Sequence, residues 1–284
     1  MSPCVYMTAM ALSDTIFLLD VSWYYSLFLQ GHLDGITDVE ERGLIIESHI
    51  FIIFTCSKVS GLYLAAMSVD RLIAVRFPMA AIRLCTTKRA KVTILLITFP
   101  ILLINIHIFY ALKYVEDIES GVRLLFYDVA AIEKAASFYV IIFGTVLPFS
   151  IIFACNLLII ITVKKASSRR AKLNSNTSRK EKDEQSQQNL TVLLLLVSLA
   201  YVVTTLPYRL HNPILEMPQL KAIYDMTQQY WKLRFSIGLF STINLWFYNY
   251  AVNFYLYCIG GGKRYMDDTK AVIDQLFPCC KFGK

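Results

Sequence analysis

Six long apolar blocks determine what this chain can fold into. The blocks cover roughly residues 5–30, 43–76, 89–113, 133–163, 189–215 and 233–259. Each is long enough to cross the ~30 Å of hydrocarbon in a bilayer as a helix. Charged residues make up only 17% of the chain, whereas a soluble domain carries roughly a quarter. The blocks also lack the short alternation of a membrane β-barrel. We therefore expect an all-α, polytopic membrane helix bundle with six transmembrane helices over residues 1–259.

Lysines and arginines orient the bundle, because cytosolic loops carry an excess of them. Of the 28, nineteen lie on the side that holds the C-terminus and the 77–88 and 164–188 connections, and eight lie on the other side. We therefore expect a cytosolic C-terminus, and six crossings place Met1 there too. The net charge of +7 then reflects topology and attraction to anionic lipid. The chain is expected in the plasma membrane, in contact with membrane lipid and not with nucleic acid.

Residues 260–284 are predicted to form a separate tail. Three glycines at 260–262 break the last helix, and apolar residues then recur at helical spacing against charged ones. This pattern is typical of a short amphipathic helix in the inner interface. Cys279 and Cys280 follow it, either as palmitoylated anchors or as unmodified thiols.

Polar residues inside a membrane span are costly, so each one needs a reason. Asp14 lies in the middle of the first block and Ser60 in the second, while Asn249 and Asn253 stack one turn apart in the last. Their carboxylate, hydroxyl and amides suit a small hard cation. A hydrogen-bonded polar cluster around a protonated Asp14 is the alternative.

Four other charged residues of the first two blocks need an explanation. Asp20 and Lys58 lie midspan and either pair across the two helices or leave Lys58 extended to the interface. Asp70 and Arg71 stand at the cytosolic end of the second block. Anchoring explains an arginine there, but it explains neither the adjacent acid nor the helix face that Arg71 shares with Ser60, eleven residues earlier.

Five short motifs, in order, resemble those of rhodopsin-like (class A) G-protein-coupled receptors. They are ALSD (11–14), VDRLIAVRFP (69–78), VLPF (146–149), TTLPY (204–208) and NYAVNFYLY (249–257). They are similar to the second-helix acid, the D/E-R-Y motif, the prolines of the fifth and sixth helices, and the N-P-x-x-Y motif. Phe254 replaces the proline of the last motif, and Thr205 stands where the family has its toggle tryptophan. The resemblance begins at the family's second helix, so it implies helices two to seven.

The resemblance implies roles for many of the polar residues. It implies a sodium ion, the one possible cofactor, bound by Asp14, Ser60, Asn249 and Asn253. It implies a G-protein switch formed by Asp70, Arg71, Asn253 and Tyr257. The partner is then a heterotrimeric G protein, on which the receptor promotes nucleotide exchange without chemistry of its own. We accordingly expect no enzyme activity, and no metal-protease motif such as H-E-x-x-H is present.

A ligand site is expected near the outer ends of the helices. We expect it to include Ile53, Phe54, Ser57, Arg209, Asn212 and Trp246. Ile53 stands where biogenic-amine receptors have an aspartate, which argues against an amine ligand. Twelve outer acids against eight bases favour a cationic peptide. The motifs are nearest to those of invertebrate FMRFamide-like neuropeptide receptors, so a neuropeptide is the predicted ligand.

Other functions remain open from the sequence. An odorant-like chemoreceptor is favoured by the missing outer disulfide and the many aromatic residues. A non-signalling truncated receptor isoform is favoured by the unmatched first helix. A small membrane transporter would show internal pseudo-symmetry and paired broken helices, and the sequence shows neither.

Overall fold

A computed structural model describes residues 2–32, 39–116, 123–127, 138–171, 192–209, 238 and 240–253. It consists of two compact units, Met1–Ser168 and Arg169–Lys284. Among the described residues, five helices are long and apolar enough to cross a membrane. They are Ser2–Leu29, Glu41–Arg76, Thr87–Tyr110, Phe138–Lys165 and Val192–Arg209. The predicted membrane helix bundle is confirmed. The sixth predicted block is helical over its described part, 240–253, and the predicted tail lies outside the described residues.

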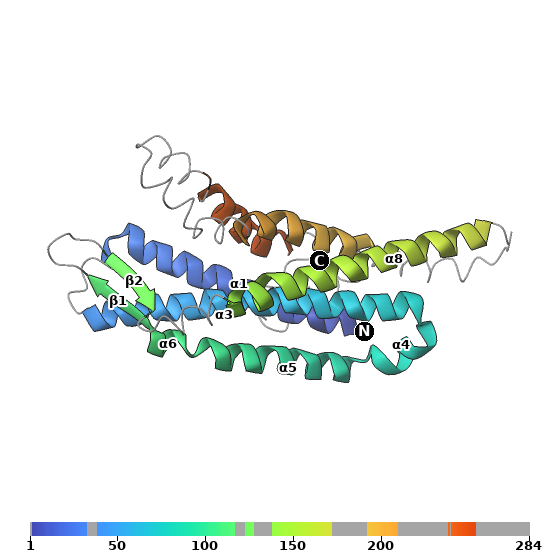
Figure 1. The fold of residues 1–284 in the computed structure, drawn as a ribbon, viewed down its shortest axis with the longest axis horizontal. Coiled ribbons are helices and arrows are strands. Elements are labelled where there is room, and N and C mark those ends of the chain that lie inside the picture. Colours follow the sequence, from blue (N-terminus) through green and yellow to red (C-terminus); the bar gives the residue numbers. More distant parts are fainter. Residues whose placement is uncertain are drawn as a thin grey trace, which may run out of the picture. The chain divides into compact units, whose positions relative to one another are not determined.

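In the first unit, α3 (Val39–Arg76) is the central helix. It packs against both α1 (Ser2–Leu29) and α5 (Thr87–Asn105), which also touch each other (Figure 1). Residues 55–65 of α3 are buried without interruption, so this helix is surrounded on every side at mid-length. A helix buried on all sides belongs in the interior of a bundle. The polar side chains of α3 therefore have to find partners on neighbouring helices.

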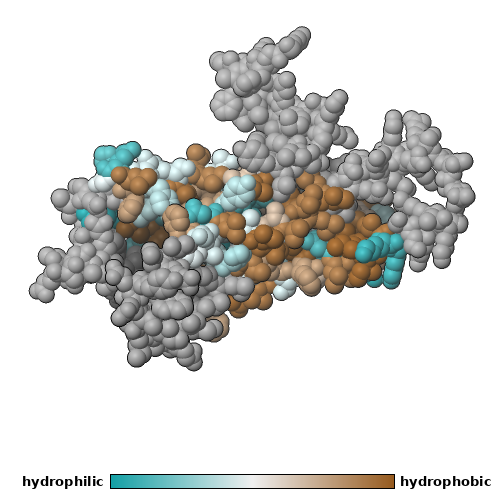
Figure 2. Space-filling view, turned by 90° about the horizontal axis from the view of Figure 1, so that it is seen from above, coloured by the Kyte–Doolittle hydropathy of each residue, from teal (hydrophilic) through white to brown (hydrophobic). Residues whose placement is uncertain are grey.

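The first helix, α1, is apolar on both faces but buried on only one. The buried side chains recur at helical spacing: Ser2, Pro3, Tyr6, Met7, Met10, Ser13, Asp14, Phe17 and Asp20. Leu12, Ile16, Leu19 and Trp23 follow the opposite face and are 44–66% exposed. Figure 2 shows such apolar side chains, in brown, over much of the described surface that it draws. Lipid is as apolar as the protein interior, so polarity alone does not distinguish the two faces.

The helix ends are set by local sequence. Gly31 follows α1 with φ +68°, a left-handed conformation that favours glycine. Thr86 caps α5, because its Oγ1 accepts a hydrogen bond from the Arg89 amide at 3.3 Å. Between α3 and α5, the short helix α4 (Pro78–Leu84) begins at a proline, whose missing N–H costs nothing in a first turn.

Two local features depart from straight spanning helices. The third predicted block, roughly 89–113, is helical but divided into α5 and the short α6 (Ile108–Ala111). After it, β1 (Leu112–Glu116) pairs antiparallel with β2 (Arg123–Tyr127), with Leu112 opposite Tyr127. Outside the spans a chain does not have to be helical to satisfy its backbone. This hairpin, in the predicted 114–132 connection, is an addition that the apolar pattern did not indicate.

The other feature is a widened helical turn. The π-helix η1 (Ile142–Val146) leads directly into α8 (Leu147–Ala171). Pro148 has no N–H to donate to the carbonyl of Gly144, four residues earlier, and its ring would clash with that carbonyl. A π turn relieves both problems. Gly144 is buried, and η1 packs against α3.

The buried face of α1 can be tested with two nearby substitutions. Phe17 is 0% exposed and Leu19 is 66% exposed. We expect Phe17→Ala to lower stability by about 3–5 kcal/mol because it leaves a cavity against the bundle. Leu19→Ala should cost little, because lipid fills the space. Melting temperatures of both variants in nanodiscs measure the difference, and equal losses would contradict this orientation of α1.

Candidate functional site

Asp14 and Ser60 meet at the centre of the α1–α3 contact. Ser60 Oγ donates a hydrogen bond of 2.8 Å to Asp14 Oδ1, and the two residues are only 3% and 2% exposed. Next to them, Ser13 Oγ donates to the backbone carbonyl of Cys56 at 3.2 Å. Two side-chain hydrogen bonds thus join α1 to α3 at mid-depth. The sequence predicted Asp14 and Ser60 as neighbours, whereas the Ser13 contact was missed.

Asn249 and Asn253 lie in the second unit, on helix 240–253. They are 1% and 2% exposed and one turn apart, so they lie on one buried face. Thr204 Oγ1 donates a hydrogen bond of 3.1 Å to Asn249 Oδ1. This bond joins helix 240–253 to the helix Val192–Arg209. The sequence analysis did not foresee Thr204, because threonine is common in membrane helices.

The donor atoms of these residues fit a small hard cation. In the first unit, Asp14 and Ser60 offer only oxygens, and the carboxylate would supply the negative charge for Na⁺. In the second unit, Asn249 and Asn253 each offer an amide oxygen. Within the described ranges, no group of three His, Cys, Asp or Glu side chains gathers as a metal site.

At the predicted cytosolic end of α3, Asp70 joins three segments. Its carboxylate accepts a hydrogen bond from Ser2 Oγ, at the start of α1. Its backbone carbonyl accepts one from Cys85 Sγ at 3.4 Å. The adjacent Arg71 is 5% exposed. The sequence predicted Asp70 and Arg71 as a functional pair but did not predict Ser2 or Cys85, which are far away along the chain.

The lysine in the middle of α3 is enclosed and does not extend to the interface. Lys58 is 2% exposed, and its Nζ lies 3.4 Å from Asn105 Oδ1 on α5. The same ammonium lies 4.6 Å from the ring centroid of Phe54 and 4.8 Å from that of Tyr139. Asn105 in turn donates to Thr55 Oγ1 at 2.7 Å. An amide oxygen and two aromatic faces thus stabilise the buried charge.

Asp20 is the other midspan charge of the first unit. Its carboxylate lies 2.6 Å from Nδ1 of His49 on α3. The sequence left a pairing of Asp20 with Lys58 and an extended Lys58 open. The structure shows neither arrangement, because Asp20 contacts His49 and Lys58 contacts Asn105. The sequence did contain a signal for these contacts, because Asn105 is a polar residue in the third apolar block and His49 is one in the second. The sequence analysis overlooked both residues.

Two residues of the predicted ligand site meet in the second unit. Trp246 is 3% exposed and stacks on Tyr208, with ring centroids 4.4 Å apart and planes at 9°. The Arg209 guanidinium lies 5.5 Å from the same indole, a cation–π distance. Thr205, at the expected toggle position, is 1% exposed. Trp246 is thus buried among other aromatic side chains, with the Tyr250 ring centroid 6.0 Å from its own.

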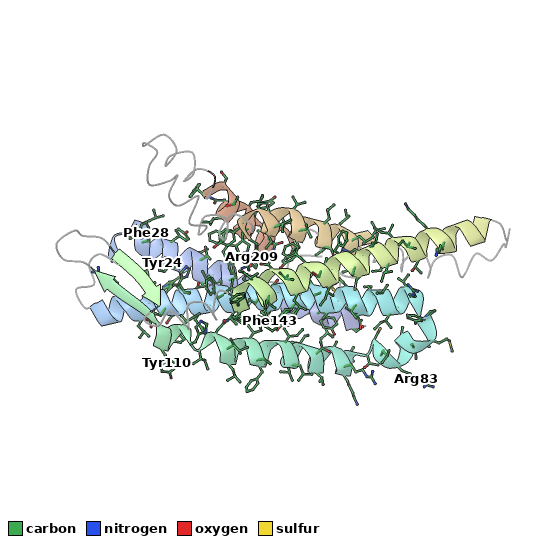
Figure 3. All side chains as sticks on the ribbon, in the orientation of Figure 1. Tyr24, Phe28, Arg83, Tyr110, Phe143 and Arg209 are labelled. Atoms are coloured by element: carbon green, nitrogen blue, oxygen red, sulfur yellow. The ribbon has the colours of Figure 1, made fainter. Side chains whose placement is uncertain are left out.

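The other predicted ligand residues lie along α3 or outside the described residues. Ile53 and Phe54 are half-buried, and Ser57 is buried, on consecutive turns of α3. Asn212, Tyr257, Cys279 and Cys280 lie outside the described residues. Figure 3 labels Tyr24 and Phe28 near one end of the first unit and Arg83 at the other. The described candidates of this unit therefore fall into a central group, an outer group and a cytosolic group.

Comparison with known proteins identifies one family. Residues 2–249 match the sequence description of the family "7 transmembrane receptor (rhodopsin family)". A search of curated proteins found no significant relative. The family match extends over most of the chain and includes the first four motifs described above, but only the first residue, Asn249, of the last.

The contacts of Asp70 affect the reactivity of Cys85. Burial, the negative charge of Asp70 and the hydrogen bond to Asp70 raise the pKa of the Cys85 thiol to about 11, while the charge of Arg71 opposes this rise. The thiolate is the reactive form of cysteine. At pH 8, with a pKa of about 11, only about one Cys85 in a thousand is ionised.

We expect alkylation of Cys85 by a maleimide to be slow at pH 7–8 and to accelerate about tenfold per pH unit up to about pH 11. Asp70→Asn should accelerate it at pH 8, because the negative charge that opposes ionisation is removed. Labelling of each cysteine is followed by peptide mass spectrometry, with the exposed Cys4 as the internal reference. A Cys85 rate that does not change with pH would contradict the raised pKa.

Proposed function

The chain belongs to the rhodopsin family of seven-transmembrane receptors, and from this premise we propose that it senses an extracellular neuropeptide and activates a heterotrimeric G protein. The observation that carries the proposal is the buried Arg71 at the predicted cytosolic end of α3, beside an Asp70 whose carboxylate is bonded to Ser2. An arginine that only anchored the helix would extend toward lipid headgroups.

Release of Arg71 is the proposed cytosolic step. Burying a guanidinium is costly unless neighbouring groups compensate its charge. A second conformation that exposes Arg71 recovers this cost, and the planar fork of five donors then binds carbonyls or carboxylates of a G protein. Asp70 and its bond to Ser2 favour the resting conformation. We assign the accompanying movement to helix 192–209, where Pro207 weakens the backbone ladder.

Ligand recognition is proposed at the other end of the helices. In the first unit, Ile53 and Phe54 would supply apolar contacts. In the second unit, Arg209 would bind an acidic or amidated group of the peptide. The guanidinium of Arg209 lies over Trp246, which stacks on Tyr208. A ligand that draws Arg209 away therefore alters the packing of the buried Trp246 indole on helix 240–253. Tyr208 and Arg209, which contact this indole, directly follow Pro207 in helix 192–209. The excess of outer acids favours a cationic peptide through electrostatic attraction.

Nucleotide exchange on a purified heterotrimer tests the proposal directly. The chain is reconstituted in nanodiscs and screened with basic amidated peptides. Arg71→Ala should lower stimulated exchange about tenfold or more, because charge-assisted hydrogen bonds are worth 1.5–3 kcal/mol. Asp70→Asn should raise basal exchange.

Arg83→Ala is the matched control, because Arg83 is an exposed arginine of α4 at the same end of the unit (Figure 3). It should leave exchange unchanged. Unchanged stimulated nucleotide exchange in Arg71→Ala would contradict the proposal and indicate that Arg71 has only a structural role. Activation by small odorants but by no peptide would support the chemoreceptor alternative.

We also propose that Asp14 and Ser60, within the first unit, bind Na⁺. Replacing a chloride salt of a large organic cation by NaCl at equal ionic strength should then raise the melting temperature, because an ion that binds only the folded state stabilises it. Asp14→Asn removes the negative charge and should abolish the increase. An increase that persists in Asp14→Asn would instead support the hydrogen-bonded polar cluster.

A further inference from the structure

The ammonium group of Lys58 joins three segments of the first unit at mid-length of α3. Its Nζ lies 3.4 Å from Asn105 Oδ1 on α5. It also lies 4.6 Å from the ring centroid of Phe54, one turn earlier on α3, and 4.8 Å from that of Tyr139, on the helix Phe138–Lys165. Lys58 is only 2% exposed. None of the family motifs described above includes these four residues.

Tyr139 connects this ammonium to the π turn. Its ring centroid lies 5.4 Å from that of Phe143, with the ring planes at 43°. Phe143, labelled in Figure 3, is part of η1, and η1 packs against α3. A continuous line of contacts therefore runs from Lys58 through Tyr139 to the widened turn.

The segment before this turn is attached to α3 mainly through Tyr139. A π turn is a rare geometry that occurs frequently at functional sites, so helix 138–165 has a weak point directly after this segment. Phe138 and Ile141 are 66% and 39% exposed, whereas Tyr139 and Val140 are half-buried. Of these four residues, Tyr139 has the largest side chain, and its ring faces the Lys58 ammonium.

Movement of this segment away from α3 would uncover a buried charge. An ammonium inside a helix bundle is costly unless neighbouring groups compensate it. The Asn105 amide oxygen and the rings of Phe54 and Tyr139 compensate it together in the described arrangement. A desolvated cation–π contact is strong enough to shift an equilibrium about tenfold. The contact with Tyr139 therefore favours the arrangement in which helix 138–165 lies against α3.

We propose that Lys58 and Tyr139 are positioning residues that hold helix 138–165 against α3 in the resting receptor and separate on activation. The inference rests on the proposed receptor function and adds a means of regulating it. The contact lies more than three helical turns of α3 before Arg71, so it acts apart from the cytosolic switch. In the resting receptor it limits basal nucleotide exchange.

Lys58→Met tests the role of the charge, with basal and peptide-stimulated nucleotide exchange measured on the full chain in nanodiscs. Methionine keeps most of the side-chain length but carries no charge. We expect basal exchange to rise about tenfold and the melting temperature to be retained, because apolar side chains of similar volume often replace buried ionic groups without loss of stability. Lys91→Met, at an exposed lysine of α5, is the matched control and should leave basal exchange unchanged.

Two substitutions of Tyr139 test the aromatic contact. Tyr139→Leu removes the ring and should raise basal exchange as Lys58→Met does, whereas Tyr139→Phe keeps the ring and should behave as the parent chain. The double variant Lys58→Met/Tyr139→Leu should not exceed either single variant, because both changes break the same contact. A purely structural role would instead lower the melting temperature and reduce basal and stimulated exchange together.

Amide hydrogen exchange gives a second readout that does not depend on a G protein. In Lys58→Met we expect the amides of residues 142–146 to exchange about tenfold faster. Residues 59–64 of α3 should exchange as in the parent chain. Faster amide exchange at 142–146, in a chain that no peptide stimulates, would overturn the receptor function and leave the contact between Lys58 and Tyr139.

Three results would each overturn the positioning role. They are unchanged basal nucleotide exchange in Lys58→Met of a chain that peptides stimulate, equal basal exchange in Tyr139→Leu and Tyr139→Phe, and unchanged amide exchange at 142–146. If Lys58→Met does not fold, the two variants of Tyr139 decide. Peptide-stimulated nucleotide exchange that none of these variants alters overturns the positioning role but leaves the receptor function.

Discussion

A polar side chain inside a bilayer finds no water to bond to, and this constraint organises α3. Each polar group on this helix has to be compensated by a group on an adjacent helix or by its own backbone. Ser60 bonds to Asp14, His49 to Asp20, Lys58 to Asn105, and the Tyr63 hydroxyl to that of Thr98. A single interhelical hydrogen bond in a membrane is worth only about 0.6 kcal/mol on average. The larger effect is the cost of leaving one of these groups unpaired, which fixes how α1 and α5 rotate against α3.

This constraint explains which contacts the sequence could predict. Asp14 and Ser60 are at similar depth in consecutive spans, so their pairing followed from topology. More than one possible partner lies at the same depth in the membrane as Lys58, and depth alone does not determine which of them it contacts. The choice depends on helix rotation, which an apolar pattern does not encode when lipid and protein interior are equally apolar. For the same reason the sequence did not distinguish the buried Phe17 from the exposed Leu19.

Local chemistry set the features that the block pattern missed. The blocks were long enough to indicate spans, but they do not record how a backbone adapts between or within them. Pro148 removes one donor, and the turn before it widens into η1 against α3. The hairpin of β1 and β2 follows α6 at a point where the helical requirement of the hydrocarbon has ended. Both the π turn and the hairpin can be explained from single residues or short segments once the structure is known. Neither changes the hydropathy of its block enough to be predicted from the sequence.

Four polar contacts lie along the interface between α1 and α3. The Asp20–His49 pair is at the predicted outer end, the Asp14–Ser60 and Ser13–Cys56 bonds are central, and the Ser2–Asp70 bond is at the predicted cytosolic end. Asp20 and Ser2 are 18 residues apart, or about 27 Å along a helix. A ligand shifts a conformational equilibrium only by its difference in affinity for the two states. A ligand that separates α1 from α3 would therefore have to bind the separated state more tightly by at least the free energy of these contacts.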